Sequence, residues 1–75
     1  MNINDVKGVL KNTGFIKLRG SEDMVIVFHS HYFDSYVIEL NGRAMHSYKS
    51  ISGAIRKINQ YINRFGLKGN DDELI

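Results

Sequence analysis

The pattern of apolar and polar residues predicts its clearest element between residues 51 and 65. Apolar side chains recur there every three or four positions, which is the spacing of one face of an α-helix: Ile51, Ala54, Ile55, Ile58, Tyr61, Ile62 and Phe65. Ser50 stands directly before this stripe, where a side-chain oxygen can accept a free backbone N–H. Gly66 follows it, where glycine can take the left-handed conformation that ends a helix. We therefore expect an amphipathic helix over these residues.

A shorter apolar stripe near the N-terminus predicts a second helix. It places three residues on one side: Val6, Val9 and Leu10. Asn4 or Asp5 can cap the start of this helix through a side-chain oxygen, and Gly14 can end it. Gly8 weakens a helix by roughly 1 kcal/mol relative to alanine, so we expect this helix to depend on packing.

Between the two helices the pattern changes to alternation, which predicts β-strands. The expected strands are 15–19, 24–29, 35–40 and 43–48. The second of them is apolar on both sides, so we expect it at the centre of a sheet. Asn41 and Gly42 predict a two-residue hairpin turn between the last two strands, because both residues tolerate positive φ.

These elements follow one another in the order α-β-β-β-β-α. The simplest architecture is an α+β fold, in which a small antiparallel sheet of three to four strands carries the N-terminal and the C-terminal helix on one face. We expect residues 1–70 to form this single domain and residues 71–75 to form an acidic C-terminal tail. A chain of 75 residues buries a limited core, so we expect modest stability.

Composition excludes several classes of function. The chain has no cysteine, which rules out disulfides and cysteine-based metal sites. It has no apolar run near the roughly 18 residues of a membrane span, so we expect a cytoplasmic protein without membrane association. No nucleophile elbow, P-loop or glycine-rich dinucleotide loop is present, and the acidic residues are scattered. We therefore expect a binding protein that is not an enzyme and uses no cofactor.

The charges are unevenly distributed along the chain. From Leu40 to Asn70 every charged residue is basic: Arg43, Lys49, Arg56, Lys57, Arg64 and Lys68. All acidic residues lie before or after this stretch. A one-sided distribution of this kind favours a partner that carries a field of its own.

The polar side of the predicted helix 51–65 is the first candidate binding surface. It combines cations with amides and contains no acidic residue: Ser52, Arg56, Lys57, Asn59, Gln60, Asn63 and Arg64. Arginine and lysine bind phosphate oxygens and guanine, whereas asparagine and glutamine bind adenine edges. The alternative is a plain solvated face, which is what charged helix faces usually are.

The predicted hairpin loop around Tyr32, Phe33 and Asp34 is the second candidate. Adjacent aromatic residues on a loop can stack on bases or anchor in a pocket of another protein. One of the two rings could instead fold back over the edge of the small core. His29 and His31 precede the loop two positions apart, but zinc binding would need a third ligand, so we expect no metal site.

The first third of the chain resembles a known family. The likeness is close over residues 1–20, allowing one gap, and returns after the central hairpin. These motifs carry it: Met1-Asn2-Ile3-Asn4-Asp5, Lys11-Asn12, Phe15, Ile16-Lys17-Leu18-x-Gly20 and Tyr36-Val37-Ile38. They resemble the opening of a small prophage-encoded anti-CRISPR protein, an inhibitor of the type II RNA-guided DNA nuclease. The resemblance implies a helix, then a three-stranded sheet, then helices, which agrees with the pattern above.

The resemblance also implies a mechanism. Members of this family act as acidic mimics of DNA in the site where the nuclease reads the PAM. Asp34 falls on a matching stretch of this chain, whereas the basic second half is opposite in charge to a DNA mimic. The resemblance therefore supports the fold and a phage origin more than it supports the mechanism.

Two interpretations of function follow. In the first, the chain is a phage-type inhibitor that binds a CRISPR nuclease of the host and blocks DNA recognition or cleavage. Tyr32, Phe33 and Asp34 would then anchor it, and the basic helix would meet an acidic surface or guide-RNA phosphate. In the second, the chain is a small phage or bacterial nucleic-acid-binding domain. The polar side of helix 51–65 would then follow DNA or RNA phosphates.

Overall fold

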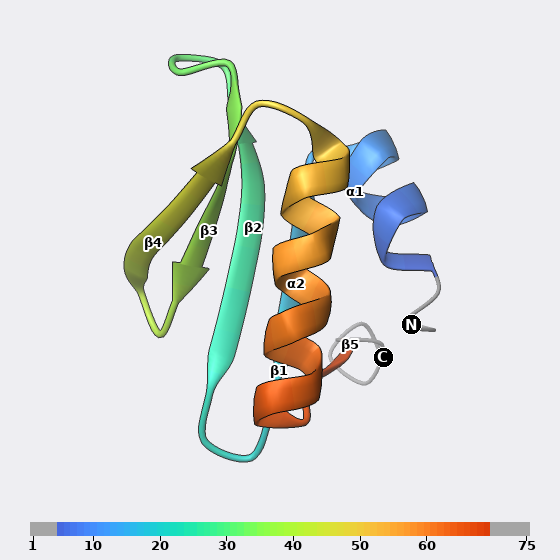
Figure 1. Ribbon diagram of the computed structural model, residues 1–75, viewed down its shortest axis with the longest axis vertical. Helices are drawn as coiled ribbons and strands as arrows, with labels where there is room; N and C mark the ends of the chain where they lie inside the picture. Colours follow the sequence, from blue (N-terminus) through green and yellow to red (C-terminus); the bar gives the residue numbers. More distant parts are fainter. Residues whose placement is uncertain (1–4, 70–75) are drawn as a thin grey trace.

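The computed structural model describes residues 5–69 as two helices packed on an antiparallel sheet (Figure 1). The elements are α1 (Val6–Thr13), β1 (Phe15–Arg19), β2 (Met24–Ser30), β3 (Ser35–Leu40), β4 (Arg43–Tyr48), α2 (Ile51–Phe65) and β5 (Lys68–Gly69). The predicted α+β class and the order α-β-β-β-β-α are confirmed. The predicted acidic tail 71–75 lies outside the described residues.

The strand order in the sheet is β4-β3-β2-β1-β5, and every pair of neighbours is antiparallel. The predicted central strand, β2, lies in the middle of this order. Its inward residues Val25 and Val27 are fully buried. Side chains of a central strand pack against neighbours on both edges, which favours apolar residues on both of its sides.

Both helices pack on one face of the sheet and close the core there. The buried apolar residues come from α1, from three strands, from α2 and from the segment that follows it: Val6, Leu10, Ile16, Leu18, Val25, Val27, Ile38, Ala54, Ile58, Tyr61, Ile62 and Leu67. The apolar stripe of α2 predicted from the sequence therefore supplies a large part of the core. In the part of the chain that the structure describes, neither helix is long and apolar enough to cross a membrane.

The other side of the sheet, which we call the open face, is turned away from both helices. The alternation of the strands assigns these residues to it: Phe15, Lys17, Arg19, Met24, Ile26, Phe28, Val37 and Glu39. Within residues 5–69 no helix covers this face (Figure 1). The open face is therefore a surface on which side chains from three neighbouring strands lie together.

The turn between β3 and β4 has the predicted conformation. Asn41 and Gly42 have φ of 53° and 85°. The Asn41 side chain also connects this turn to the turn before β2, because its Oδ1 accepts the Met24 N–H at 2.8 Å and its Nδ2 donates to Asp23 at 3.0 Å. One residue thus fixes two neighbouring turns.

Three of the four helix ends have the cap or stop residue that the sequence predicted. The Ser50 hydroxyl accepts the Gly53 N–H at 3.1 Å at the start of α2, and Gly66 ends this helix with φ of 64°. Gly14 ends α1 with φ of 70°. The expected cap at the start of α1 is not formed by Asp5, because its helical backbone conformation leaves the side chain without a capping hydrogen bond. Asn4 lies outside the described residues.

Strand β5 was not predicted and extends the sheet beyond the expected three to four strands. Its two residues pair with β1, Lys68 opposite Arg19 and Gly69 opposite Leu18. Leu67, just before it, is buried, and its N–H donates to the Ile62 carbonyl at 3.2 Å. The buried leucine therefore holds the chain against the sheet edge as it leaves α2.

Candidate binding surfaces

The loop between β2 and β3 presents two aromatic side chains to solvent. Tyr32 is 89% exposed and Phe33 is 62% exposed. Their rings contact each other edge to face, with centroids 4.8 Å apart. The alternative that one ring folds back over the core is therefore wrong for this structure, and both rings are accessible to a partner.

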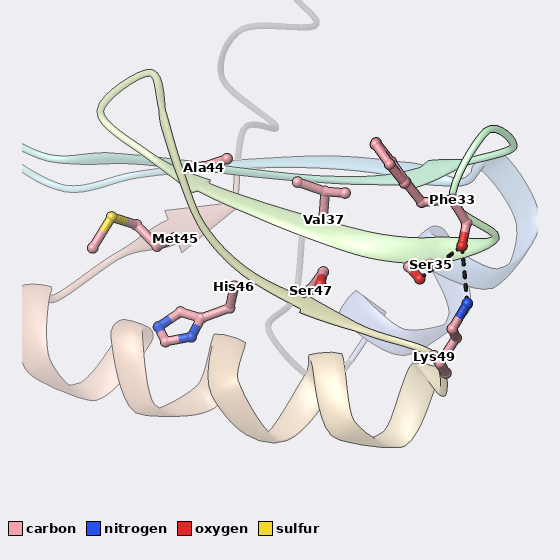
Figure 2. A pocket seen from close by; sticks show the side chains of 8 residues that line it. All are labelled: Phe33, Ser35, Val37, Ala44, Met45, His46, Ser47 and Lys49. Carbon is pink, nitrogen blue, oxygen red and sulfur yellow. Dashed lines mark hydrogen bonds between the residues drawn. The ribbon is translucent and has the colours of Figure 1, made fainter.

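Hydrogen bonds connect the exposed loop to the ends of the neighbouring strands. The Phe33 N–H donates to the Ser30 hydroxyl at 3.2 Å. The Phe33 carbonyl accepts from the Lys49 ammonium and from the Ser35 hydroxyl, each at 3.0 Å (Figure 2). Asp34 takes a positive φ of 50°. A loop that is ordered before binding loses less conformational entropy when it meets a partner.

Asp34 completes the loop with an exposed carboxylate. Its side chain is 88% exposed, and Oδ1 lies 3.5 Å from Nε2 of His29. An exposed pair of this kind contributes little to stability. The carboxylate is therefore accessible on the same loop as the two aromatic rings.

A shallow hollow of about 500 Å³ lies beside the loop, on the side of the sheet turned away from α2. Figure 2 shows that Phe33, Val37 and Ala44 point to this side, whereas His46 points toward α2. These residues line the hollow: Phe33, Ser35, Val37, Ala44, Met45, His46, Ser47 and Lys49. Of these residues, Phe33 was predicted from the sequence as a binding residue, and the others were not.

The missed residues become neighbours through the pairing of β3 with β4. Val37 lies opposite Ser47, and the register shifts between Ile38 and Glu39, so that Ala44 rather than Met45 lies opposite Glu39. Such a bulge inserts an extra residue and re-aims its side chain. The alternation of 35–40 could have indicated Val37, whereas the bulge at Met45 had no signal in the sequence.

The polar side of α2 is as exposed as the sequence suggested. Five predicted binding residues lie on it and are all exposed: Arg56, Asn59, Gln60, Asn63 and Arg64. Lys57 is half-buried, and its ammonium donates to Gln60 Oε1 at 3.0 Å. The Arg64 guanidinium lies 5.4 Å from the centroid of the Phe65 ring. Within residues 5–69 no carboxylate pairs with Arg56 or Arg64, so this side presents a positive surface.

The two sets of predicted site residues do not form one site. Helix α2 covers the inner face of the sheet, and its exposed residues point away from the sheet. The Phe33 ring lies on the opposite side (Figure 2). The loop and the polar side of α2 are therefore two separate surfaces.

The histidines pack against aromatic rings. The His29 ring centroid lies 5.1 Å from that of His31 and 4.9 Å from that of Tyr36. His46 lies on β4, 6.1 Å from Tyr61 of α2. Among the residues that the structure describes, no three histidine, cysteine or acidic side chains gather into a group that could hold a metal ion.

The comparisons with protein-family models, with curated proteins and with solved structures find no match to this chain. The resemblance to anti-CRISPR proteins therefore stays a prediction from the sequence.

Proposed function

We propose that this protein is a non-enzymatic, phage-type inhibitor that binds a CRISPR nuclease in the host cytoplasm and blocks its DNA recognition or cleavage. One observation carries the proposal of a protein partner: Tyr32 and Phe33 are exposed on a loop that hydrogen bonds hold in place. The choice of target depends on the resemblance of residues 1–20 to anti-CRISPR proteins.

A protein partner accounts for the exposure of these rings. Burying an aromatic side chain at an interface supplies a large share of the binding free energy, and such anchors lie beside pockets that exclude water. Phe33 borders the hollow lined by Val37 and Ala44. Side chains of the partner could occupy part of this hollow while Phe33 enters a pocket of the partner.

The proposal gives Asp34 a separate role. In the family that the chain resembles, carboxylates replace DNA in front of the arginines that read guanine. The Asp34 carboxylate is 88% exposed on the same loop. We infer that it would pair with a cation of the nuclease next to the aromatic anchor.

The test is inhibition of DNA cleavage by a type II nuclease loaded with guide RNA, together with direct binding to that complex. We expect Phe33→Ala to weaken inhibition at least about tenfold, because a buried anchor is lost. Phe33→Tyr keeps the ring and should retain most of the inhibition. Lys7→Ala, on the exposed side of α1, is the control and should behave like the parent protein.

Circular dichroism of each variant separates a lost anchor from a lost fold. The proposal is wrong if the parent protein neither binds the nuclease nor inhibits it. The role of the loop is wrong if folded Phe33→Ala inhibits as well as the parent.

A second candidate function is binding of nucleic acid through the polar side of α2. The observation that favours it is the exposed set of arginines and amides with no carboxylate paired to Arg56 or Arg64 within the described residues. Labelled duplex DNA should then bind with an affinity that falls steeply with salt. Arg56→Ala and Arg64→Ala should each remove one phosphate contact. Each change should therefore reduce the slope of log affinity against log salt concentration by about one. Salt-independent binding, or no binding at low salt, would exclude this candidate.

A further inference from the structure

We propose that the open face of the sheet binds single-stranded nucleic acid by stacking bases on the rings of Phe15 and Phe28. This inference is independent of the nuclease as target. Its binding residues are neither those of the Phe33 loop nor those of the polar side of α2, although Val37, the partner of Phe28 on β3, also lines the hollow beside that loop.

The register of the sheet makes the two rings neighbours. Phe15 and Phe28 are direct partners across the pairing of β1 with β2. In both strands the residues that alternate with them are buried in the core, Ile16 on β1 and Val27 on β2. The two phenylalanines therefore project from the open face side by side.

These rings are not needed to fill the core. The inner face of the same strands already carries Ile16, Leu18, Val25 and Val27, all of them buried. Phe15 is 47% exposed, and Phe28 is partly exposed. An aromatic pair left open to water on a sheet is a surface to which a flat partner can bind.

Cations lie next to the rings on the same face. Lys17 and Arg19 follow Phe15 at alternate positions of β1, opposite Ile26 and Met24 of β2. Both residues also take part in interactions within the protein. A lysine ammonium has three N–H donors and an arginine guanidinium has five, so each group can contact more than one acceptor at a time. Of the residues that β1, β2 and β3 contribute to this face, Glu39 is the acidic one.

The combination of rings and cations fits an unpaired strand rather than a duplex. Exposed aromatic rings on neighbouring antiparallel strands stack the bases of single strands, and basic residues beside them follow the phosphates. The Cβ atoms of directly opposed residues in an antiparallel pair lie about 5 Å apart, so the two rings are close enough to take two successive bases of one strand. In a duplex the faces of the bases are already stacked on one another and are not accessible to such rings.

The test uses fluorescence anisotropy with a labelled twelve-nucleotide uridine strand, a thymidine strand of the same length and a duplex of that length. We expect the single strands to bind more tightly than the duplex. Phe15→Ala should weaken single-strand binding by about 5- to 150-fold, which is the usual cost of losing one stacked base. Phe15→Tyr keeps a ring and should bind within about threefold of the parent protein.

Matched charge variants test the phosphate contacts. Lys17→Ala should weaken binding and reduce its salt dependence, whereas Lys7→Ala removes the same charge from α1 and should have less effect. Phe28→Ala is a second test of the platform, and its fold is checked by circular dichroism because Phe28 is only partly exposed.

The inference is overturned if single strands do not bind at low salt, or if folded Phe15→Ala and Phe28→Ala bind as the parent does. It is also overturned if Phe15→Ala abolishes binding to the nuclease while no nucleic acid binds, since the face would then be a protein interface. Nuclease inhibition is measured separately, so failure of the strand-binding test leaves the proposed function untouched.

Discussion

At the scale of single residues, Asn41 does more than shape a turn. It takes a positive φ of 53°, accepts the Met24 N–H and donates to the Asp23 carboxylate. Its backbone N–H also donates to the Met24 carbonyl at 2.8 Å. The turn that follows β3 and the turn that precedes β2 are thus joined through one side chain, and a substitution there should act on both.

We predict that Asn41→Ala lowers the free energy of unfolding by about 2 kcal/mol. The change removes two side-chain hydrogen bonds. It also places alanine, which tolerates positive φ less well than asparagine, in this backbone conformation. Asn41→Gly removes the same hydrogen bonds but tolerates the backbone conformation, so it should cost less, about 1 kcal/mol. Urea unfolding monitored by circular dichroism measures both. Equal losses for the two variants would show that the backbone conformation is not strained.

At the scale of elements, the parts predicted correctly are those with local signals. Helix α2 carries its cap at Ser50, its stop at Gly66 and an uninterrupted apolar stripe, and the structure has it over Ile51–Phe65. The hairpin at Asn41-Gly42 is a similar case, because an Asn-Gly pair by itself strongly favours a two-residue turn. Such elements need no knowledge of the partner strands.

The parts that were missed depend on long-range pairing. Strand β5 has two residues and gains its conformation by pairing with Leu18 and Arg19, so no alternation could reveal it. The opposition of Phe15 and Phe28 requires the register of β1 with β2. The hollow beside Phe33 requires the bulge near Met45. The loop and the polar side of α2 were predicted as candidates from the sequence. Adjacent aromatic residues in a predicted turn, and a helix face whose charges have one sign, can be recognised without knowledge of the fold.

Two glycines give opposite predictions for the same substitution. A Cβ at Gly20 would lie 2.8 Å from the Phe65 carbonyl oxygen, at the end of α2, whereas a Cβ at Gly8 would meet nothing within 4 Å. We expect Gly20→Ala to destabilise the fold by about 1–3 kcal/mol, because β1 and α2 must move apart. Gly8→Ala should stabilise it by about 0.5–1 kcal/mol through helix propensity. Thermal unfolding compares them, and a stabilised Gly20→Ala variant would contradict the close approach.

At the scale of the whole molecule, the fold distributes its candidate surfaces around one small core. The polar side of α2 lies on one side of the sheet, and the open face lies on the other, with the Phe33 loop at its margin. Positive charge is found on both sides, at Arg56 and Arg64 on the helix and at Lys17 and Arg19 on β1. Because a polyanion can approach basic residues from either side, variants at individual residues are needed to locate its contacts.

Asp71, Asp72 and Glu73 are the acidic residues that follow the basic second half of the sequence. We predict that the triple variant Asp71→Asn, Asp72→Asn and Glu73→Gln, which removes three negative charges from a chain of net charge +2, binds single strands and duplex more tightly at low salt. The gain should be on the order of tenfold and should shrink as salt rises, because it arises from long-range attraction to phosphate. Anisotropy titrations at several salt concentrations measure this gain.

Each amide side chain has nearly the same size as the carboxylate side chain it replaces. A change in affinity therefore reports the loss of charge itself. If affinity does not change, these acids do not influence the binding surfaces. If nuclease inhibition is lost while nucleic-acid binding rises, the acids contact the nuclease directly.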